Sequence, residues 1–179
     1  MKIVHFLGYS GSGKTFTISC LIRELSKAGK NIGTLKHVHS QDFSIDRRGK
    51  DSWIFKKSGA SVMIVLSPHE SVVIRQKRIG SQLDSESALD NAFRVLKKEK
   101  LDYLFVEGFN NMLEKKPQIK RIVCARNERE MEKLLKLHKK VDCIVGKNQN
   151  KFRLTGKHIS KISVLFLPKN KTELIQIIS

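Results

Sequence analysis

The 179-residue chain is poor in cysteine and in aromatic residues, and it has no long apolar run. Cys20, Cys124 and Cys143 are odd in number and lack C-x-x-C spacing, which argues against a disulfide framework or a structural zinc site and favours a reducing, cytoplasmic location. No apolar stretch approaches the roughly 18–20 residues that span a bilayer. The first residues carry no small-residue cleavage pattern, so we expect neither a secretory signal nor a membrane-spanning segment.

Acidic residues are also scarce, because 17 Asp and Glu face 35 Lys and Arg, for a formal net charge of +18. Residues 91–179 hold 21 of the basic and 9 of the acidic residues. Such a charge suits nucleic acid, an anionic membrane surface, an acidic protein or phosphorylated small molecules. With 40% hydrophobic residues the chain can bury a core, and its length predicts a single nucleotide-binding domain over residues 1–179.

Apolar strand patterns alternate with helical ones, and this order predicts an α/β fold. We expect a P-loop NTPase-type three-layer fold with a mainly parallel central sheet and a β-hairpin insertion that makes that sheet mixed. The expected strands cover 2–7, 31–36, 101–106, 119–125, 141–145 and, more weakly, 162–167; the hairpin pairs 62–66 with 71–75; and the helices cover 14–28, 86–98, 128–137 and 171–178.

Residues 8–15, GYSGSGKT, match the phosphate-loop pattern G-x-x-x-x-G-K-S/T between an expected strand and an expected helix. Glycines let backbone N–H groups turn toward phosphate oxygens, and the positive end of the following helix faces the same anion. Lys14 is expected to neutralise the β- and γ-phosphates, and the Thr15 hydroxyl to ligate Mg²⁺. The pattern predicts a nucleoside triphosphate bound by Gly8, Ser10, Gly11, Ser12, Gly13, Lys14, Thr15 and Phe16.

A phosphate-loop protein usually has an acid at the end of a neighbouring buried strand, where it positions Mg²⁺ or the attacking water. Glu107 follows the apolar segment LFV and is our candidate for this second metal ligand, and with Lys14 for the catalytic pair. Asp102 lies at the start of the same strand, where a parallel sheet keeps it far from the phosphates.

The segment after the second strand is dense in polar side chains. His37 and His39 could share a face and bind a metal with a third ligand from Asp42 or Asp46, although ordinary loop residues are the commoner reading. Arg47, Arg48 and Lys50 form a cationic cluster suited to a second phosphate or an acidic partner. Asp51 or Ser52 is expected to cap a helix that contains Trp53 and Phe55. Farther on, Gly146-Lys147-Asn148 follows a strand at the place where GTP-binding folds read the base, without the Asp typical of that loop, and a plain basic turn is the alternative.

These motifs together resemble those of the molybdopterin-guanine dinucleotide biosynthesis protein B (MobB) family. The resemblance rests on GYSGSGKT at 8–15, KHVHSQDFSIDRRGKDSW at 36–53, SGASVMIVLSPHESVVI at 58–74, LFVEGFN at 104–110 and PQIKRIV at 117–123, and it extends to about residue 145. Three positions depart from the family pattern: Arg48 replaces a common Pro, Ser40 a second His, and Asn110 a usual Lys.

The resemblance implies a GTP-binding protein, often a homodimer, with weak GTPase activity. It implies a partner, the molybdopterin guanylyltransferase-type enzyme that joins GMP to molybdopterin, and possible contact with molybdopterin itself. Phosphate and Mg²⁺ would be held by Gly11, Gly13, Lys14 and Thr15, with Glu107 as the second acid. His37, His39, Asp46, Arg47, Arg48, Gly49, Lys50 and Asp51 would form the substrate or partner loop.

Two alternatives use the same phosphate loop. A small-molecule kinase needs an arginine-rich lid, and the clusters available are Arg121/Arg126/Arg129 and Arg47/Arg48. A nucleic-acid-binding ATPase would explain the charge, but single-strand binders stack bases on aromatic side chains, which make up only 7% of the chain. We therefore do not expect nucleic acid as a partner.

Overall fold

In the computed structural model, residues 1–38, 40, 43–75, 86–152 and 162–179 are described. They belong to two compact units, one made of Met1–His37 and Glu86–Ser179 and the other of Val38–Ser85. Each unit is described by itself below. The boundaries of the expected single domain, 1–179, stay a prediction.

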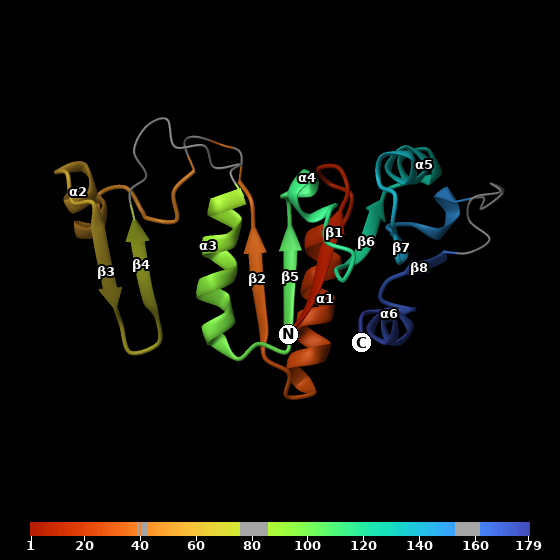
Figure 1. The fold of residues 1–179 in the computed structure, drawn as a ribbon, viewed down its shortest axis with the longest axis horizontal. Helices are drawn as coiled ribbons and strands as arrows, with labels where there is room; N and C mark the ends of the chain where they lie inside the picture. The colour runs from red at the N-terminus through yellow and green to blue at the C-terminus, as the bar shows by residue number, and fades with distance from the viewer. Residues whose placement is uncertain (39, 41–42, 76–85, 153–161) are drawn as a thin grey trace. The chain divides into compact units, whose positions relative to one another are not determined.

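The first unit contains a six-stranded sheet in the order β2-β5-β1-β6-β7-β8 (Figure 1). Every recorded strand pair in it is parallel, so the carboxyl ends of all its strands lie at one edge. The predicted α/β fold with a mainly parallel sheet is confirmed. The strands are β1 Lys2–Leu7, β2 Ile32–Lys36, β5 Tyr103–Glu107, β6 Lys120–Ala125, β7 Cys143–Gly146 and β8 Ser163–Phe166.

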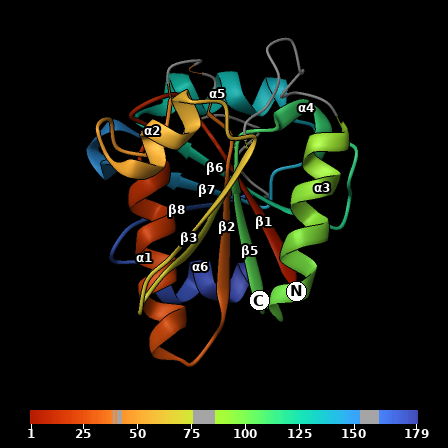
Figure 2. The ribbon, with the colours of Figure 1, turned by 90° about the vertical axis from the view of Figure 1, so that its left-hand side faces the viewer.

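Helices cover both faces of this sheet, which gives the three layers. On one face, α1 (Lys14–Lys27) and α6 (Lys171–Ile178) pack Leu21 and Leu174 against the strands. On the other, α3 (Glu86–Leu96) and α5 (Glu128–Leu137) bury Leu89 and Met131. Figure 2 shows α1 and α3 on opposite sides of β2 and β5. The shorter helices are η1 Lys97–Glu99, α4 Asn110–Leu113 and η2 Gln149–Lys151.

Two of the three cysteines lie inside the core. Cys124 and Cys143 are fully buried between the sheet and the α1–α6 layer, whereas Cys20 is half-buried. Burial raises the pKa of both buried thiols to about 12, because the thiolate would lose its hydration. The Cys124 thiol lies 3.7 Å from the hydroxyl of Thr17 on α1.

The second unit contains α2 (Asp51–Lys57) and the antiparallel pair β3 (Val62–Leu66) and β4 (Ser71–Arg75). The hairpin has its predicted bounds, but the expectation that it makes the central sheet mixed is wrong, because it forms a separate two-stranded sheet. The inner strands of the central sheet bury most of their residues, as β5 does, whereas β3 buries only Met63. A strand with one wet face does not suit the middle of a helix-covered sheet.

The predicted cap of α2 is also wrong. The N-cap is Lys50, whose extended backbone carries no side-chain cap bond. The Ser52 side chain does not cap the helix, because its hydroxyl donates a hydrogen bond of 2.8 Å to Asp46 Oδ1. Asp51 is the first helical residue and lies where a carboxylate favours the helix dipole.

Candidate functional site

A tight loop joins β1 to α1 at the carboxyl edge of the sheet. Gly8 opens it with a φ of 148°, and a Cβ there would lie 2.4 Å from the carbonyl oxygen of Cys124 and 2.5 Å from Ser12 Oγ. Only glycine therefore lets the loop pass so close to β6. Ser12 is 2% exposed, and its hydroxyl oxygen is buried without a hydrogen-bond partner in the described residues. Such an orphaned hydroxyl is costly unless a ligand supplies the missing bond.

The amino group of Lys14 lies folded over this loop. It donates hydrogen bonds of 2.9 Å to the carbonyl oxygens of Gly8 and Tyr9, and it lies 3.8 Å from Glu107 Oε1. The other carboxylate oxygen of Glu107 lies 3.5 Å from Lys36 Nζ. The structure thus brings Lys14 and Glu107 together, and it adds Lys36, which sequence analysis missed. The signal for Lys36 was its place at the end of the strand that pairs with β5.

Asp102 lies at the far end of the sheet, because β1 and β5 align Lys2 with Tyr103 and Phe6 with Glu107. Its carboxylate accepts a 2.8 Å hydrogen bond from the Asn31 amide. The expectation that it is distant from the loop is confirmed.

The backbone beyond Glu107 is held by two histidines. The His5 ring, buried inside β1, donates from Nε2 to the Gly108 carbonyl at 2.8 Å, and burial lowers the pKa of His5 to about 4. His37 extends the ladder by donating its amide to the Glu107 carbonyl at 2.9 Å, and its ring stacks on Phe109 with 4.7 Å between centroids. Since His39 and Asp42 lie outside the described residues, the histidine metal site stays untested. In the described part of the chain, no group of three His, Cys, Asp or Glu could hold a metal ion.

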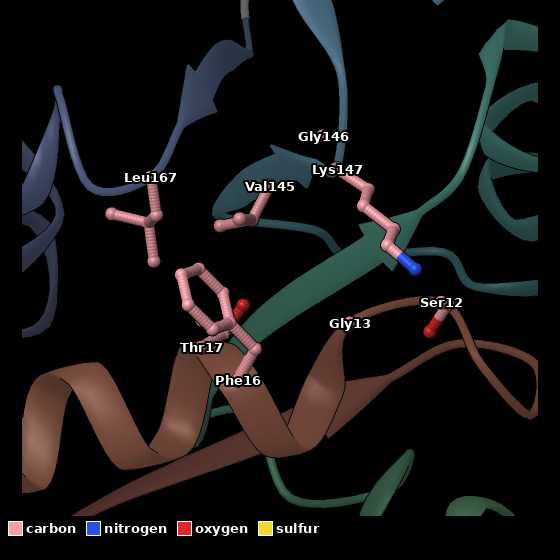
Figure 3. Close-up of a pocket in the computed structure, with 8 residues that line it drawn as sticks. All are labelled: Ser12, Gly13, Phe16, Thr17, Val145, Gly146, Lys147 and Leu167. Atoms are coloured by element: carbon pink, nitrogen blue, oxygen red, sulfur yellow. The ribbon is translucent and has the colours of Figure 1, made fainter.

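A hollow of about 220 Å³ lies beside the loop (Figure 3). The lysine side chain from the turn after β7 extends toward the segment that carries Ser12, and Phe16 lies beneath Leu167. Gly146 forms part of the wall without a side chain. Asn148 caps a local turn instead, since its side chain accepts a hydrogen bond from the Asn150 amide at 2.9 Å. The lining residues are Ser12, Gly13, Phe16, Thr17, Val145, Gly146, Lys147 and Leu167.

The residues expected to form the substrate or partner loop belong largely to the second unit, so the site built here does not include them. Within that unit, the Arg48 guanidinium lies 5.9 Å from the centre of the Trp53 ring. Arg47, Lys50 and Asp51 are exposed, and Asp46 is half-buried. Their role as a partner surface stays a prediction.

Arg121, a candidate lid residue of the kinase alternative, is a structural residue instead. Its side chain is fully buried and donates to four backbone carbonyls, those of Leu113, Glu114, Lys116 and Ile119, at 2.7–3.1 Å. Its backbone amide donates to Asp142 Oδ2 at 2.8 Å. A guanidinium so engaged cannot close over a phosphoryl group, so Arg121 is not part of a lid.

The fold and the loop define a class: a three-layer α/β protein with a glycine-rich strand–turn–helix at the carboxyl edge of a parallel sheet. The family model described as "Molybdopterin guanine dinucleotide synthesis protein B" (MobB) matches residues 3–147. The chain belongs to the MobB family, as its motifs predicted.

Curated relatives agree with this assignment. The "Molybdopterin-guanine dinucleotide biosynthesis adapter protein" of Escherichia coli is 33% identical over 114 residues, which make up 62% of this chain and 61% of that protein. The protein of the same name from Haemophilus influenzae is 31% identical over 128 residues, 72% of this chain and 65% of that one. The matched segment thus spans less than two thirds of the length of these relatives.

Solved structures show the same fold. The crystal structure of Bacillus subtilis MobB has a TM-score of 0.71 at 21% identity, covering 100% of this chain and 99% of that chain. The MobB homologue of Bacillus stearothermophilus has a TM-score of 0.66 at 16% identity, covering 99% and 98%. In the described part of this chain, no helix is long and apolar enough to cross a membrane.

Proposed function

We propose that this chain binds GTP with Mg²⁺ at the 8–15 loop, hydrolyses it slowly, and serves as an adapter in formation of the guanine dinucleotide form of molybdopterin. The biosynthetic role follows from the family and from the names of the curated relatives. The observation that carries the nucleotide proposal is the pairing of Lys14 with Glu107 at the mouth of the glycine loop.

The residues present fit a triphosphate and its magnesium ion. The buried Ser12 hydroxyl lacks a partner in the described residues, and an anion's oxygen would supply one. Mg²⁺ prefers oxygen ligands, and the Thr15 hydroxyl and the Glu107 carboxylate are the protein oxygens we assign to it. Bound there, the ion would neutralise charge on the phosphates. Lys14 would exchange its bonds to the Gly8 and Tyr9 carbonyls for phosphate oxygens.

The adjoining hollow suits the nucleoside. Its wall combines the apolar side chains of Phe16 and Leu167 with Lys147, which has an alkyl stem and a cationic amino group. A planar base can stack on an aromatic ring or an alkyl stem. We assign guanine to this hollow on the family relationship, with Lys147 as the residue that lies along the base.

Slow hydrolysis follows from the arginines of the first unit. Arg121 is locked onto carbonyls, and Arg126 is paired with Glu130. An arginine finger is worth about 10³–10⁵ in rate to this chemistry. Because both arginines are engaged elsewhere and this proposal assigns no other arginine to the phosphates, turnover would depend on Lys14, Glu107 and the metal.

The partner surfaces are proposed on the second unit. Its hairpin exposes Val62, Ile64 and Leu66, with the Leu66 side chain 74% exposed. Exposed apolar residues in a row mark protein interaction sites. We assign this face to a homodimer, and the basic 36–53 loop to the guanylyltransferase-type enzyme or to molybdopterin. The setting we propose is the cytoplasm.

Thermal stability with and without Mg-GTP tests the nucleotide proposal. At 100 times its Kd, a ligand adds about 2.7 kcal/mol to the free energy of unfolding, which for a protein of this size raises Tm by roughly 5–11 °C. Lys14→Ala should abolish the shift, whereas the exposed control Lys30→Ala should keep it. ATP and GDP run in parallel test base and γ-phosphate preference, and Lys147→Ala should narrow any gap between GTP and ATP. No shift of the unaltered protein with GTP would refute nucleotide binding.

The adapter role needs the partner. The guanylyltransferase assay, run with and without this protein, should show faster formation of the guanine dinucleotide when it is present. An unchanged rate alongside intact GTP binding would refute the adapter role alone.

A further inference from the structure

A second hollow, which the nucleotide proposal does not use, borders the phosphate loop at Tyr9. Its volume is about 370 Å³, and it lies between the loop and the start of α5. We name it the α5 pocket. It is lined by Tyr9, Arg126, Asn127, Arg129, Glu130 and Lys133.

The α5 pocket carries more positive than negative charge. Glu130 is the acidic residue of its lining. Arg126 already donates hydrogen bonds to the Glu130 carboxylate from its backbone amide at 2.9 Å, from Nε at 2.8 Å and from a further guanidinium nitrogen. Hydrogen bonding from Arg126 holds the pKa of Glu130 below its usual range, so the carboxylate stays charged and paired. The cations left over are Arg129 and Lys133, and neither makes an ion pair within the part of the chain that the structure describes.

Arg129 and Lys133 lie four residues apart on one helix, so their side chains face the same way. Two like charges in this relation destabilise a helix rather than support it. The helix end itself is not the source of the charge, because Asn127 Oδ1 already accepts from the Glu130 amide at 3.0 Å. What the pocket offers a ligand is therefore a pair of flexible cationic side chains on one wall.

The pocket has room for more than a phosphate group. At about 30 Å³ per water molecule, its volume equals that of roughly twelve waters. Tyr9, which is 41% exposed, is the aromatic residue among those that line the pocket. Its carbonyl accepts the 2.9 Å hydrogen bond from Lys14, so the pocket and the phosphate loop share one backbone segment.

We propose that the α5 pocket binds a phosphate monoester of a small, planar organic molecule. Arg129 and Lys133 hold the phosphate, because charge-assisted bonds from Arg and Lys suit its oxygens. Tyr9 contacts the organic part. Apart from Tyr9, which belongs to the 8–15 segment, the site shares no residue with the proposed GTP site, and the proposal does not depend on GTP binding.

Calorimetric titration with phenyl phosphate tests the site. To silence the phosphate loop, the titration is run in Lys14→Ala as well as in the unaltered protein. Arg129→Gln/Lys133→Gln should weaken binding by at least about tenfold in both backgrounds, since each charged hydrogen bond is worth that factor or more. Lys136→Gln/Lys139→Gln removes the same charge from positions that are exposed, as Arg129 and Lys133 are, but that lie outside the pocket, and it should change Kd by less than about twofold because only screened charge is lost. Tyr9→Ala should weaken phenyl phosphate and leave inorganic phosphate unchanged.

Each other outcome overturns the proposal. Equal losses in the two double variants would mean attraction by overall charge only. Loss of binding in Lys14→Ala would place the phosphate in the loop. Absence of phenyl phosphate binding, with a hexaglutamate peptide bound in its place through Arg129 and Lys133, would make the pocket a docking surface for acidic protein. Circular dichroism of every variant checks that a lost signal is not lost folding.

Discussion

Replacing Arg121 should destabilise the first unit more than any surface arginine can. Its guanidinium donates to four carbonyls, and two of these, on Leu113 and Ile119, belong to residues with no exposed surface. In Arg121→Met the Ile119 carbonyl loses its recorded donor, and the Leu113 carbonyl keeps only the Lys116 amide at 3.1 Å, at about 1–3 kcal/mol for each lost bond. The desolvation cost of the guanidinium disappears at the same time, so we expect a net loss of about 2–4 kcal/mol.

Two variants separate geometry from charge. Arg121→Lys keeps the charge, but one ammonium cannot reach four carbonyls in a fixed plane, so it should be destabilised as well. Arg23→Met removes an exposed arginine of α1 and should cost less than about 1 kcal/mol, because surface substitutions of this kind change stability little.

Urea unfolding followed by far-UV circular dichroism is the assay. Circular dichroism is preferred to fluorescence, because the single tryptophan, Trp53, belongs to the second unit. If the unfolding free energy of Arg121→Met stays within about 0.5 kcal/mol of the unaltered protein, the size of a change that tolerated surface substitutions produce, the carbonyl-clamp argument is wrong.

Other variants address pH, packing and capping. The pKa of His5 is about 4 in the folded state and 6.5 in the unfolded state, so the unfolded state takes up a proton first as the pH falls. Urea unfolding should therefore show about 2 kcal/mol of stability lost between pH 7.5 and 5. His5→Phe should remove this loss. Gly146→Ala places a Cβ 2.4 Å from the Phe166 ring; thermal unfolding should show an overpacking cost of about 1–3 kcal/mol, partly relieved by adding Phe166→Leu. Asn127→Ala removes the cap on the Glu130 amide and should cost about 1 kcal/mol in the same assay, whereas Asn127→Ser should cost little.

The inner strands of the central sheet were predictable because each is a short apolar run that is largely buried, whereas the edge strands β2 and β8 bury few residues. Lys2–Leu7 and the helix Glu128–Leu137 have the bounds that periodicity gives. The one-turn helix Asn110–Leu113 was missed, since four residues hold no period and Phe109 before it has a φ of 58° that no pattern announces. The separate hairpin sheet was missed because the composition of a strand does not show which other strands it pairs with.

The candidate site was predictable where one segment carries it. The loop at 8–15 and Glu107 could be located from sequence, because the ends of parallel strands share an edge. Arg121 could not be recognised as structural, because its carbonyl partners depend on how the 113–119 turn folds around it. The α5 pocket could not be seen either, because Tyr9 and Lys133 are distant in sequence and meet only through β1 and β6.

The buried thiols of Cys124 and Cys143 can be used to measure local opening of the central sheet. The thiolate is the form that attacks a thiol reagent, and a pKa near 12 leaves almost none of it at neutral pH while the sheet is closed. Half-buried Cys20 would react first. In a Cys20→Ser variant, the rate of labelling at Cys124 and Cys143 measures how often the strands beneath the phosphate loop open. A bound nucleotide should lower that labelling rate.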